Sequence, residues 1–125
     1  MVNSVSQLPS VEDITSHGNL IVNAFAFPND GCEDEVGRLI LNVKKHSDSD
    51  KEPGCLQYTV VRSYTTEGGK DWIVVFAVWE IYTSHEAFLQ HTQSEEFKTF
   101  RAAADKLVRA PSDIKFFYEA TDKTV

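Results

Sequence analysis

One segment of this 125-residue sequence, DWIVVFAVWEIY at positions 71–82, restricts the possible folds more than any other. Successive side chains of a β-strand point to opposite faces of the sheet. In this segment both alternating sets are apolar: one holds Trp72, Val74, Phe76 and Val78, and the other holds Ile73, Val75, Ala77, Trp79 and Ile81. A strand that is apolar on both faces must be covered on both faces. We therefore expect it to lie in a sheet with a packed layer on each side.

Three further segments have the composition of strands. Residues 19–27 (NLIVNAFAF) are apolar, residues 55–64 are rich in Tyr, Thr and Val, and residues 112–120 (SDIKFFYEA) are rich in aromatic side chains. Aromatic and β-branched residues of this kind fit the pleated surface of a sheet. A glycine-containing loop at residues 65–70 leads from the second of these strands to residues 71–82. This loop predicts a β-hairpin.

Residues 33–46 predict an amphipathic helix. Their apolar positions recur at the i, i+3, i+4, i+7 spacing of one helix face, namely at Val36, Leu39, Ile40 and Val43. Acidic residues stand in the first turn and basic residues in the last, which is the arrangement that the helix dipole favours. Asp30, in the preceding turn, is the candidate N-cap.

Two shorter helices are expected before the last strand. Thr83 and Glu86 match a capping box, with Thr83 as the N-cap and Glu86 at the third helical position, and the helix that follows runs through His91. Ser94 is the candidate N-cap of the next helix, which Pro111 ends. The apolar face of that helix consists of Phe97, Phe100, Ala104 and Leu107.

The predicted order is strand, helix, strand, strand, helical segment, strand. This is the order of the ferredoxin-like βαββαβ fold, an α+β fold with an antiparallel four-stranded sheet. The helices cover one face of such a sheet, and the apolar residues on its other face need a partner. We therefore expect a homodimer with two-fold symmetry. Residues 19–120 form this domain, residues 1–18 a flexible N-terminal arm, and residues 121–125 a C-terminal tail.

Charge and cysteine usage narrow the classes of partner and location. The formal net charge is −7, from 19 acidic and 12 basic residues. Nucleic acids and anionic membrane surfaces are bound through clustered Lys and Arg, so neither is expected as a partner. Cys32 and Cys55 show neither metal-ligand spacing nor a disulfide framework, and the first residues do not read as a signal peptide. These features predict a cytoplasmic protein.

Individual histidines are the first candidates for chemistry, because no P-loop, dinucleotide fingerprint, metal-ligand spacing or nucleophile elbow occurs in the sequence. His17 and His46 lie in polar segments, so we expect them to be solvated, and we expect the ring of His85 to point outward. His91 follows Phe88 by three residues and so shares the helix face that packs on the sheet. It is either a buried core residue or a neutral imidazole that acts as a general base near pH 7.

Other side chains could either line a pocket or fill the core. Asn23 interrupts an apolar strand and needs hydrogen-bond partners if it is buried, which a cavity, a ligand or a local bulge would supply. Trp79 and Tyr58 are candidates for the core or for a pocket wall. Arg62 and Arg101 are the cations nearest to the aromatic segments, and each could equally be a surface residue.

The stretch from Glu52 to Phe100 resembles the antibiotic biosynthesis monooxygenase family, which belongs to the dimeric α+β barrel proteins. Three motifs carry the resemblance. The first is EPGC at residues 52–55, before the second strand, and the second is WE at residues 79–80. The third has the spacing E-A-x-x-x-H-x-x-S-x-x-F and is formed here by Glu86, Ala87, His91, Ser94 and Phe97.

The resemblance implies an activity and a set of site residues. Enzymes of this family commonly oxygenate a quinol, an anthrone-like polyketide or another phenolic aromatic substrate with O2, and they use no metal, flavin or haem. The protein binds, deprotonates and shields the substrate, which itself passes an electron to O2. By this resemblance His91 is the base or hydrogen-bond donor, and Trp79 and Asn23 complete the catalytic set. The substrate-binding residues would be Phe25, Tyr58, Arg62, Phe88, Phe97, Phe100 and Arg101.

Two alternatives to a monooxygenase remain. The first is a non-oxidative barrel enzyme, such as a polyketide cyclase or an isomerase, and the second is a non-catalytic, stress-responsive binding protein. Haem-degrading relatives use an Asn, a Trp and a His, whereas the matching positions of this sequence hold Asn23, His91 and Arg101. The resemblance therefore does not favour haem breakdown.

Overall fold

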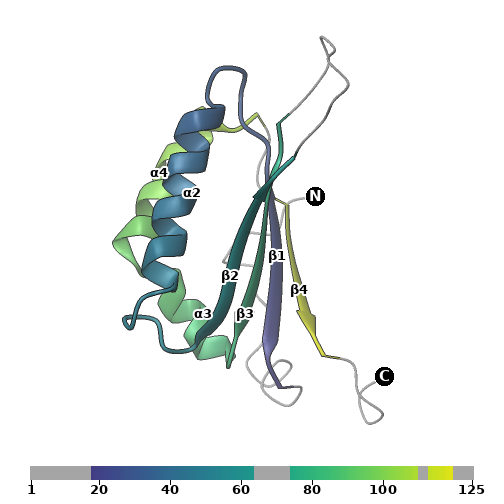
Figure 1. Cartoon of the computed structure of the whole chain (residues 1–125), viewed down its shortest axis with the longest axis vertical. Coiled ribbons are helices and arrows are strands. Elements are labelled where there is room, and N and C mark those ends of the chain that lie inside the picture. The colour runs from purple at the N-terminus through teal and green to yellow at the C-terminus, as the bar shows by residue number, and fades with distance from the viewer. Residues whose placement is uncertain (1–17, 64–73, 110–112, 120–125) are drawn as a thin grey trace.

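The computed structural model describes residues 18–63, 74–109 and 113–119. These ranges contain β1 (Leu20–Ala26), α2 (Glu33–Ser47), β2 (Cys55–Arg62), β3 (Phe76–Tyr82), α3 (His85–His91), α4 (Glu95–Leu107) and β4 (Asp113–Tyr118). The strands form one antiparallel sheet in the order β2-β3-β1-β4. All three helices lie on the same side of it (Figure 1). None of them is both long and apolar enough to cross a lipid bilayer. The predicted ferredoxin-like α+β fold is confirmed.

The core lies between α2 and the sheet. All four residues of the predicted apolar stripe are buried, and Val36, Ile40 and Val43 pack in one cluster with Phe76 and Val78 of β3. Burial of an aliphatic or aromatic side chain of this size contributes about 1.5–3 kcal/mol relative to its exposure. Gly37 lets α2 approach closely, since a Cβ atom there would lie 2.9 Å from the Phe76 ring.

The register of the sheet sorts neighbouring residues of β3 between its two faces. Trp79 pairs with Asn23 of β1, and Glu80 pairs with Val22. Because side chains alternate along a strand, Trp79 and Glu80 point to opposite faces. The buried set, which packs against the helices, consists of Phe76, Val78, Glu80 and Tyr82.

The short helix α3 and the longer helix α4 begin at serine caps. The Oγ atom of Ser84 accepts a hydrogen bond from the backbone N–H of Ala87 at 3.1 Å, so the prediction of Thr83 as the N-cap was wrong by one residue. Ser94 caps α4 as predicted. Because α4 packs mainly against α2, its predicted apolar face is only partly buried.

Several other predicted boundaries differ from the structure. Cys32 occupies the N-cap position of α2 without a side-chain hydrogen bond, and Asp30 instead forms an ion pair with Arg109 at 2.8 Å. Strand β3 begins at Phe76 rather than at residue 71. The predicted hairpin loop at residues 65–70 lies outside the described residues, as do the N-terminal arm up to residue 17 and the C-terminal tail.

The second face of the sheet carries apolar side chains on each of its strands, mixed with polar ones such as Lys115, and none of the described helices covers it (Figure 1). Trp79 lies near its middle and is 45% exposed. Val61 of β2 and Phe117 of β4 are also exposed. Asn23 on this face is buried, and its Oδ1 atom has no hydrogen-bond partner within the part of the chain that the structure describes. We refer to this surface, centred on Trp79, as the open face.

Candidate functional site

A cluster of polar and titratable side chains lies inside the layer between the helices and the sheet. Charged side chains are seldom fully buried unless they are paired. This cluster is held in place by α2, the turn after it, β3 and α3, and it consists of Ser47, Glu52, Glu80, Tyr82 and His91. Each of these residues is buried.

His91 is the centre of the cluster. It is the last residue of α3, its ring faces the sheet as predicted, and its side chain is only 1% exposed. Aromatic rings surround the imidazole, with centroid separations of 5.3 to 6.2 Å. These rings belong to Tyr58, Tyr82, Phe88 and Phe97.

The hydrogen bonds of His91 determine which ring nitrogen carries the hydrogen. Its Nδ1 atom lies 2.8 Å from Oε1 of Glu52 and 3.2 Å from Oγ of Ser47. The Ser47 hydroxyl already donates to the backbone carbonyl of Val43 at 2.9 Å, so its oxygen is an acceptor toward His91. A carboxylate is also an acceptor. Nδ1 therefore carries the hydrogen, and Nε2 of the neutral ring holds the free lone pair.

Glu52 bridges two histidines. Burial by itself would raise the pKa of this carboxyl, but hydrogen bonds from His91 and His46, together with the charge of these rings when they are protonated, outweigh burial and lower the pKa. His91 contacts Oε1, and Nδ1 of His46 contacts Oε2. Glu52 is therefore a carboxylate at neutral pH that fixes the orientation of the His91 ring.

A tight turn places Glu52 against α3. The backbone N–H of Thr83 donates to the carbonyl of Gly54 at 2.9 Å. A Cβ atom on Gly54 would lie 2.5 Å from the Cβ atom of Ala87, so only glycine fits between the turn and the helix. The EPGC motif thus brings a carboxylate to a histidine that is 39 residues further along the chain.

Glu80 is a second buried carboxyl on the sheet side of His91. Its Oε1 atom lies 3.8 Å from Nε2 of His91 and accepts a hydrogen bond from the Tyr82 hydroxyl. Burial raises the pKa of Glu80 to about 7, and the nearby His91 partly opposes this rise. Burial and the charge of Glu80 also raise the pKa of Tyr82. Nε2 of His91 therefore faces a carboxyl that binds its proton more tightly than an exposed glutamate does.

The structure divides the predicted site residues between the two faces of the sheet. Those between helices and sheet are His91, Tyr58, Phe88, Phe97 and Phe100. Those on the open face are Asn23, Trp79 and Phe25. The sheet thus separates His91 from Trp79 and Asn23, the other two members of the predicted catalytic set.

The two predicted arginines lie away from this cluster. Arg62 stands at the end of β2, where its guanidinium lies 5.6 Å from the centroid of the Phe76 ring and 3.6 Å from the carboxylate of Asp34. Arg101 is exposed on α4. Neither reaches the polar groups around His91 in the described contacts.

Two expectations about histidines were wrong. His85 does not point to solvent: it is buried, and neither of its ring nitrogens has a hydrogen-bond partner among the described residues. His46 is not freely solvated, because the turn after α2 folds back and brings Glu52 onto its Nδ1 atom. His17 lies outside the described residues.

Four residues of the cluster were not among the predicted site residues: Glu52, Glu80, Ser47 and Tyr82. A signal for Glu80 and Tyr82 was present, since both continue the alternating set of Phe76 and Val78 that faces the helices. A carboxylate in such a set has to be buried. No comparable signal existed for Ser47, whose position depends on how α2 packs over α3.

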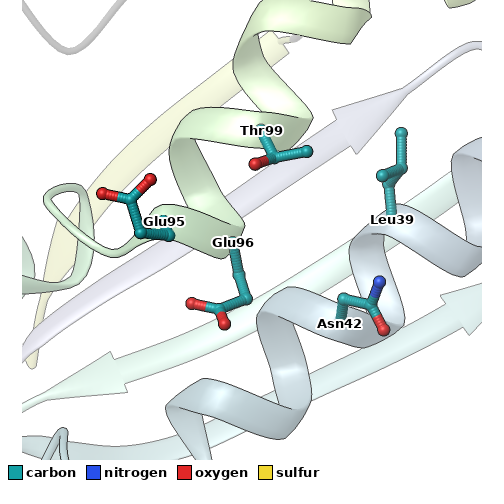
Figure 2. Close-up of a pocket in the computed structure, with 5 residues that line it drawn as sticks. All are labelled: Leu39, Asn42, Glu95, Glu96 and Thr99. Carbon is teal, nitrogen blue, oxygen red and sulfur yellow. The ribbon is translucent and has the colours of Figure 1, made fainter.

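A small surface pocket of about 130 Å³ lies between α2 and α4. Figure 2 shows its lining, with Leu39 and Asn42 on α2 facing Glu95, Glu96 and Thr99 on α4. It is separate from the buried cluster but adjoins His46, whose Nε2 atom lies 3.9 Å from Oε1 of Glu96.

The donor groups do not assemble into a metal site. Within residues 18–63, 74–109 and 113–119, no group of three or more His, Cys, Asp or Glu side chains could hold a metal ion. Both cysteines are free, and burial raises the pKa of the Cys55 thiol to about 12. That thiol stays neutral and weakly nucleophilic.

Solved structures share this fold. A candidate antibiotic biosynthesis monooxygenase from Caulobacter crescentus is 26% identical, with a TM-score of 0.69, over 84% of this chain and 92% of its own. Proteins from Mycobacterium tuberculosis and Pseudomonas aeruginosa have TM-scores of 0.69 and 0.67, each at 20% identity over 83% of this chain. These matches cover 97% and 96% of the two proteins and show the fold alone.

A comparison with protein families gives the more specific assignment. The family described as antibiotic biosynthesis monooxygenase matches residues 19–103, which is more than half of the chain. A search of curated proteins finds no match. The matched range includes all three motifs that carried the resemblance in the sequence, together with Glu52, Glu80 and His91. The chain belongs to the antibiotic biosynthesis monooxygenase family.

Proposed function

We propose that this protein is a cofactor-independent monooxygenase of a phenolic aromatic substrate, such as a quinol or an anthrone, with His91 as the general base. One observation carries the proposal. Glu52 and Ser47 both accept from Nδ1 of His91, which leaves the Nε2 lone pair among aromatic rings. A neutral imidazole with a fixed tautomer is suited to take a proton from a phenol near pH 7.

The chemistry needs little from the protein beyond this base. Transfer of the phenolic proton to Nε2 breaks the O–H bond and leaves an electron-rich phenolate, which gives an electron to O2. One oxygen atom enters the substrate and the other leaves as water. In an anthrone, a CH2 group and O2 become a carbonyl and H2O; in a quinol, the ring takes up oxygen at a C–H position, so that the quinol and O2 become a hydroxyquinone and H2O. The proton on His91 returns to the reduced oxygen. Glu52 stabilises the imidazolium in the meantime, because its carboxylate accepts from Nδ1.

The surroundings of His91 favour a flat aromatic substrate. The imidazole is nearly parallel to the Phe88 ring, at an interplanar angle of 28°, and meets the Phe97 ring edge-on at 65°. Because His91 is only 1% exposed, substrate entry requires one of these rings to move aside. Phe97 is the better candidate, since it lies on α4 and is partly exposed, whereas Phe88 is buried.

Oxygen consumption with a panel of hydroquinones and anthrones tests the proposal. We expect one O2 to be consumed per substrate and an oxygenated product that contains one atom from labelled O2. Turnover should survive dialysis against a chelator, because the base is a side chain. Substrate conversion without O2 uptake would contradict the proposal and support a cyclase or isomerase.

A non-catalytic binding protein is the second candidate. The complete burial of His91 favours it, because an imidazole that is already hydrogen-bonded and enclosed can be explained by stability alone. Under this alternative the same compounds raise the melting temperature without being converted. Measuring turnover and melting temperature on one sample distinguishes the two candidates.

A further inference from the structure

Titratable side chains form a continuous series from the interior of the protein to its surface. Oε1 of Glu52 lies 2.8 Å from Nδ1 of His91, and Oε2 of the same carboxylate contacts Nδ1 of His46. The far side of the His46 ring points toward Glu96, with Nε2 lying 3.9 Å from Oε1. Glu52 and His46, the two middle members, therefore each use one polar atom toward the inner neighbour and another toward the outer neighbour.

Exposure increases along this series. The side chains of His91 and Glu52 are 1% and 4% exposed, His46 is 19% exposed, and Glu96 is 39% exposed. Glu96 lines the surface pocket between α2 and α4 (Figure 2). Among the described residues, this series connects the buried base to water through side chains that are able to gain and lose a proton.

We propose that Glu52, His46 and Glu96 form the path along which His91 exchanges protons with solvent. His91 has almost no direct contact with water, so its ring needs neighbouring groups to exchange protons with solvent. In the proposed reaction the proton taken from the substrate goes back to the reduced oxygen, and the path sets the protonation state of His91 between turnovers. The use of the path in turnover rests on the proposed function. The path itself rests only on the contacts and can be tested without a substrate.

Each passage along the path moves one proton and no electrons. An N–H bond of the His91 imidazolium breaks at Nδ1, an O–H bond forms on Oε1 of Glu52, and rotation of the carboxyl group turns this hydrogen toward His46. His46, in the tautomer with its hydrogen on Nε2, takes the proton at Nδ1 as the O–H bond breaks and releases the Nε2 proton toward Glu96. The reverse passage returns a proton to Nδ1 of His91 and restores the starting tautomers. The last gap, 3.9 Å, is longer than a hydrogen bond, and one water molecule at this partly exposed position can bridge it.

The direct test is the rate at which the Nδ1 hydrogen of His91 exchanges with water, measured by NMR on protein with isotope-labelled histidine. In the wild type this hydrogen should exchange faster than the backbone amides of α3. In His46→Gln, which can still donate to Glu52 but cannot relay a proton, exchange should slow about tenfold or more. Added imidazole should restore fast exchange in His46→Ala, which a merely structural role of His46 would not produce.

The two pocket glutamates provide a matched pair. Glu96→Gln should slow the exchange, and Glu95→Gln, in the same pocket but outside the series, should leave it unchanged. An unchanged rate in His46→Gln would overturn the path. Should His46→Gln fail to fold, Glu96→Gln decides in its place, because its exposed side chain can be replaced without disturbing the core. Absence of oxygenase activity would leave this measurement intact, so the two proposals fail separately.

Discussion

At the scale of single residues, replacing His91 distinguishes a catalytic role of this side chain from a purely structural one. We expect His91→Ala to lower kcat by roughly 10²–10⁴-fold, the usual contribution of a positioned acid–base group. Because it also leaves Oε1 of the buried Glu52 without its hydrogen bond, it should cost about 1–3 kcal/mol of unfolding free energy. Turnover and urea unfolding on the same variant check both expectations.

His85→Asn is the matched control for that experiment. His85 lies on the same helix and is also buried, but it has no hydrogen bond to the cluster around Glu52. Its replacement should leave kcat within about twofold of the wild type, since a substitution outside the site does not alter transition-state stabilisation. Loss of stability in His91→Ala with kcat retained would show that His91 is a core residue and not the base.

Glu80 predicts a pH dependence of stability. Burial raises the pKa of its carboxyl from 4.5 to about 7, so the folded protein binds this proton more tightly than the unfolded chain does. The proton on Glu80 therefore adds on the order of 3 kcal/mol to the free energy of unfolding. This contribution is complete below about pH 4.5 and is lost as the pH rises through about 7. Glu80→Gln stays neutral and should lack this loss.

Unfolding free energies of both proteins at about pH 5 and about pH 8 measure the effect. Glu86→Gln, which removes an exposed carboxylate of α3, serves as the control and should keep the pH dependence of the wild type. If Glu80→Gln and the wild type lose equal stability over this range, Glu80 is ionised in the folded protein throughout.

At the scale of elements, the contact between the turn at residues 52–54 and α3 holds the site together. Gly54→Ala would place a methyl group 2.5 Å from the Cβ atom of Ala87 and should destabilise the protein by about 1–3 kcal/mol, the usual cost of overpacking. It should also lower kcat, because Glu52 moves with the turn. Ala87→Gly removes the clashing group and should restore much of both losses in the double variant, as unfolding and turnover measurements would show. Additive losses would mean that the two residues do not touch.

Periodicity in the sequence was enough to predict the elements but not the contacts between them. The helical spacing of Val36 to Val43 and the apolar strands predicted α2, β1 and β3, because these patterns reflect one-sided or two-sided burial. The N-cap of α3 was placed at Thr83 because Thr83 and the adjacent Ser84 can both cap a helix. Strand alternation could also have shown that Trp79 and His91 lie on opposite sides of the sheet, because Glu80 and not Trp79 belongs to the set that faces the helices. The Glu52–His91 contact depends on tertiary packing, which local patterns do not encode.

At the scale of the whole molecule, the open face lacks a cover among the described residues. We propose that a second copy packs there, sheet against sheet, around a two-fold axis. Three aromatic or aliphatic side chains of this face, Trp79, Val61 and Phe117, are each 45% exposed. Exposed apolar surface of this extent commonly marks an interface. An obligate interface of this kind buries more than about 2,000 Å² in total.

A charge at the centre of the open face should therefore separate the two copies. We expect the wild type to sediment at about 28 kDa, twice the chain mass of 14.1 kDa, because two-fold pairing covers both open faces at once. Trp79→Asp should sediment as a monomer at micromolar concentration, since a buried carboxylate without a partner opposes association. Leu41→Asp is the matched control: Leu41 is 54% exposed on α2, away from the sheet, and its replacement should leave the dimer intact. A monomeric wild type would contradict the proposed pairing, and dissociation of both variants would show that the contact does not depend on the open face.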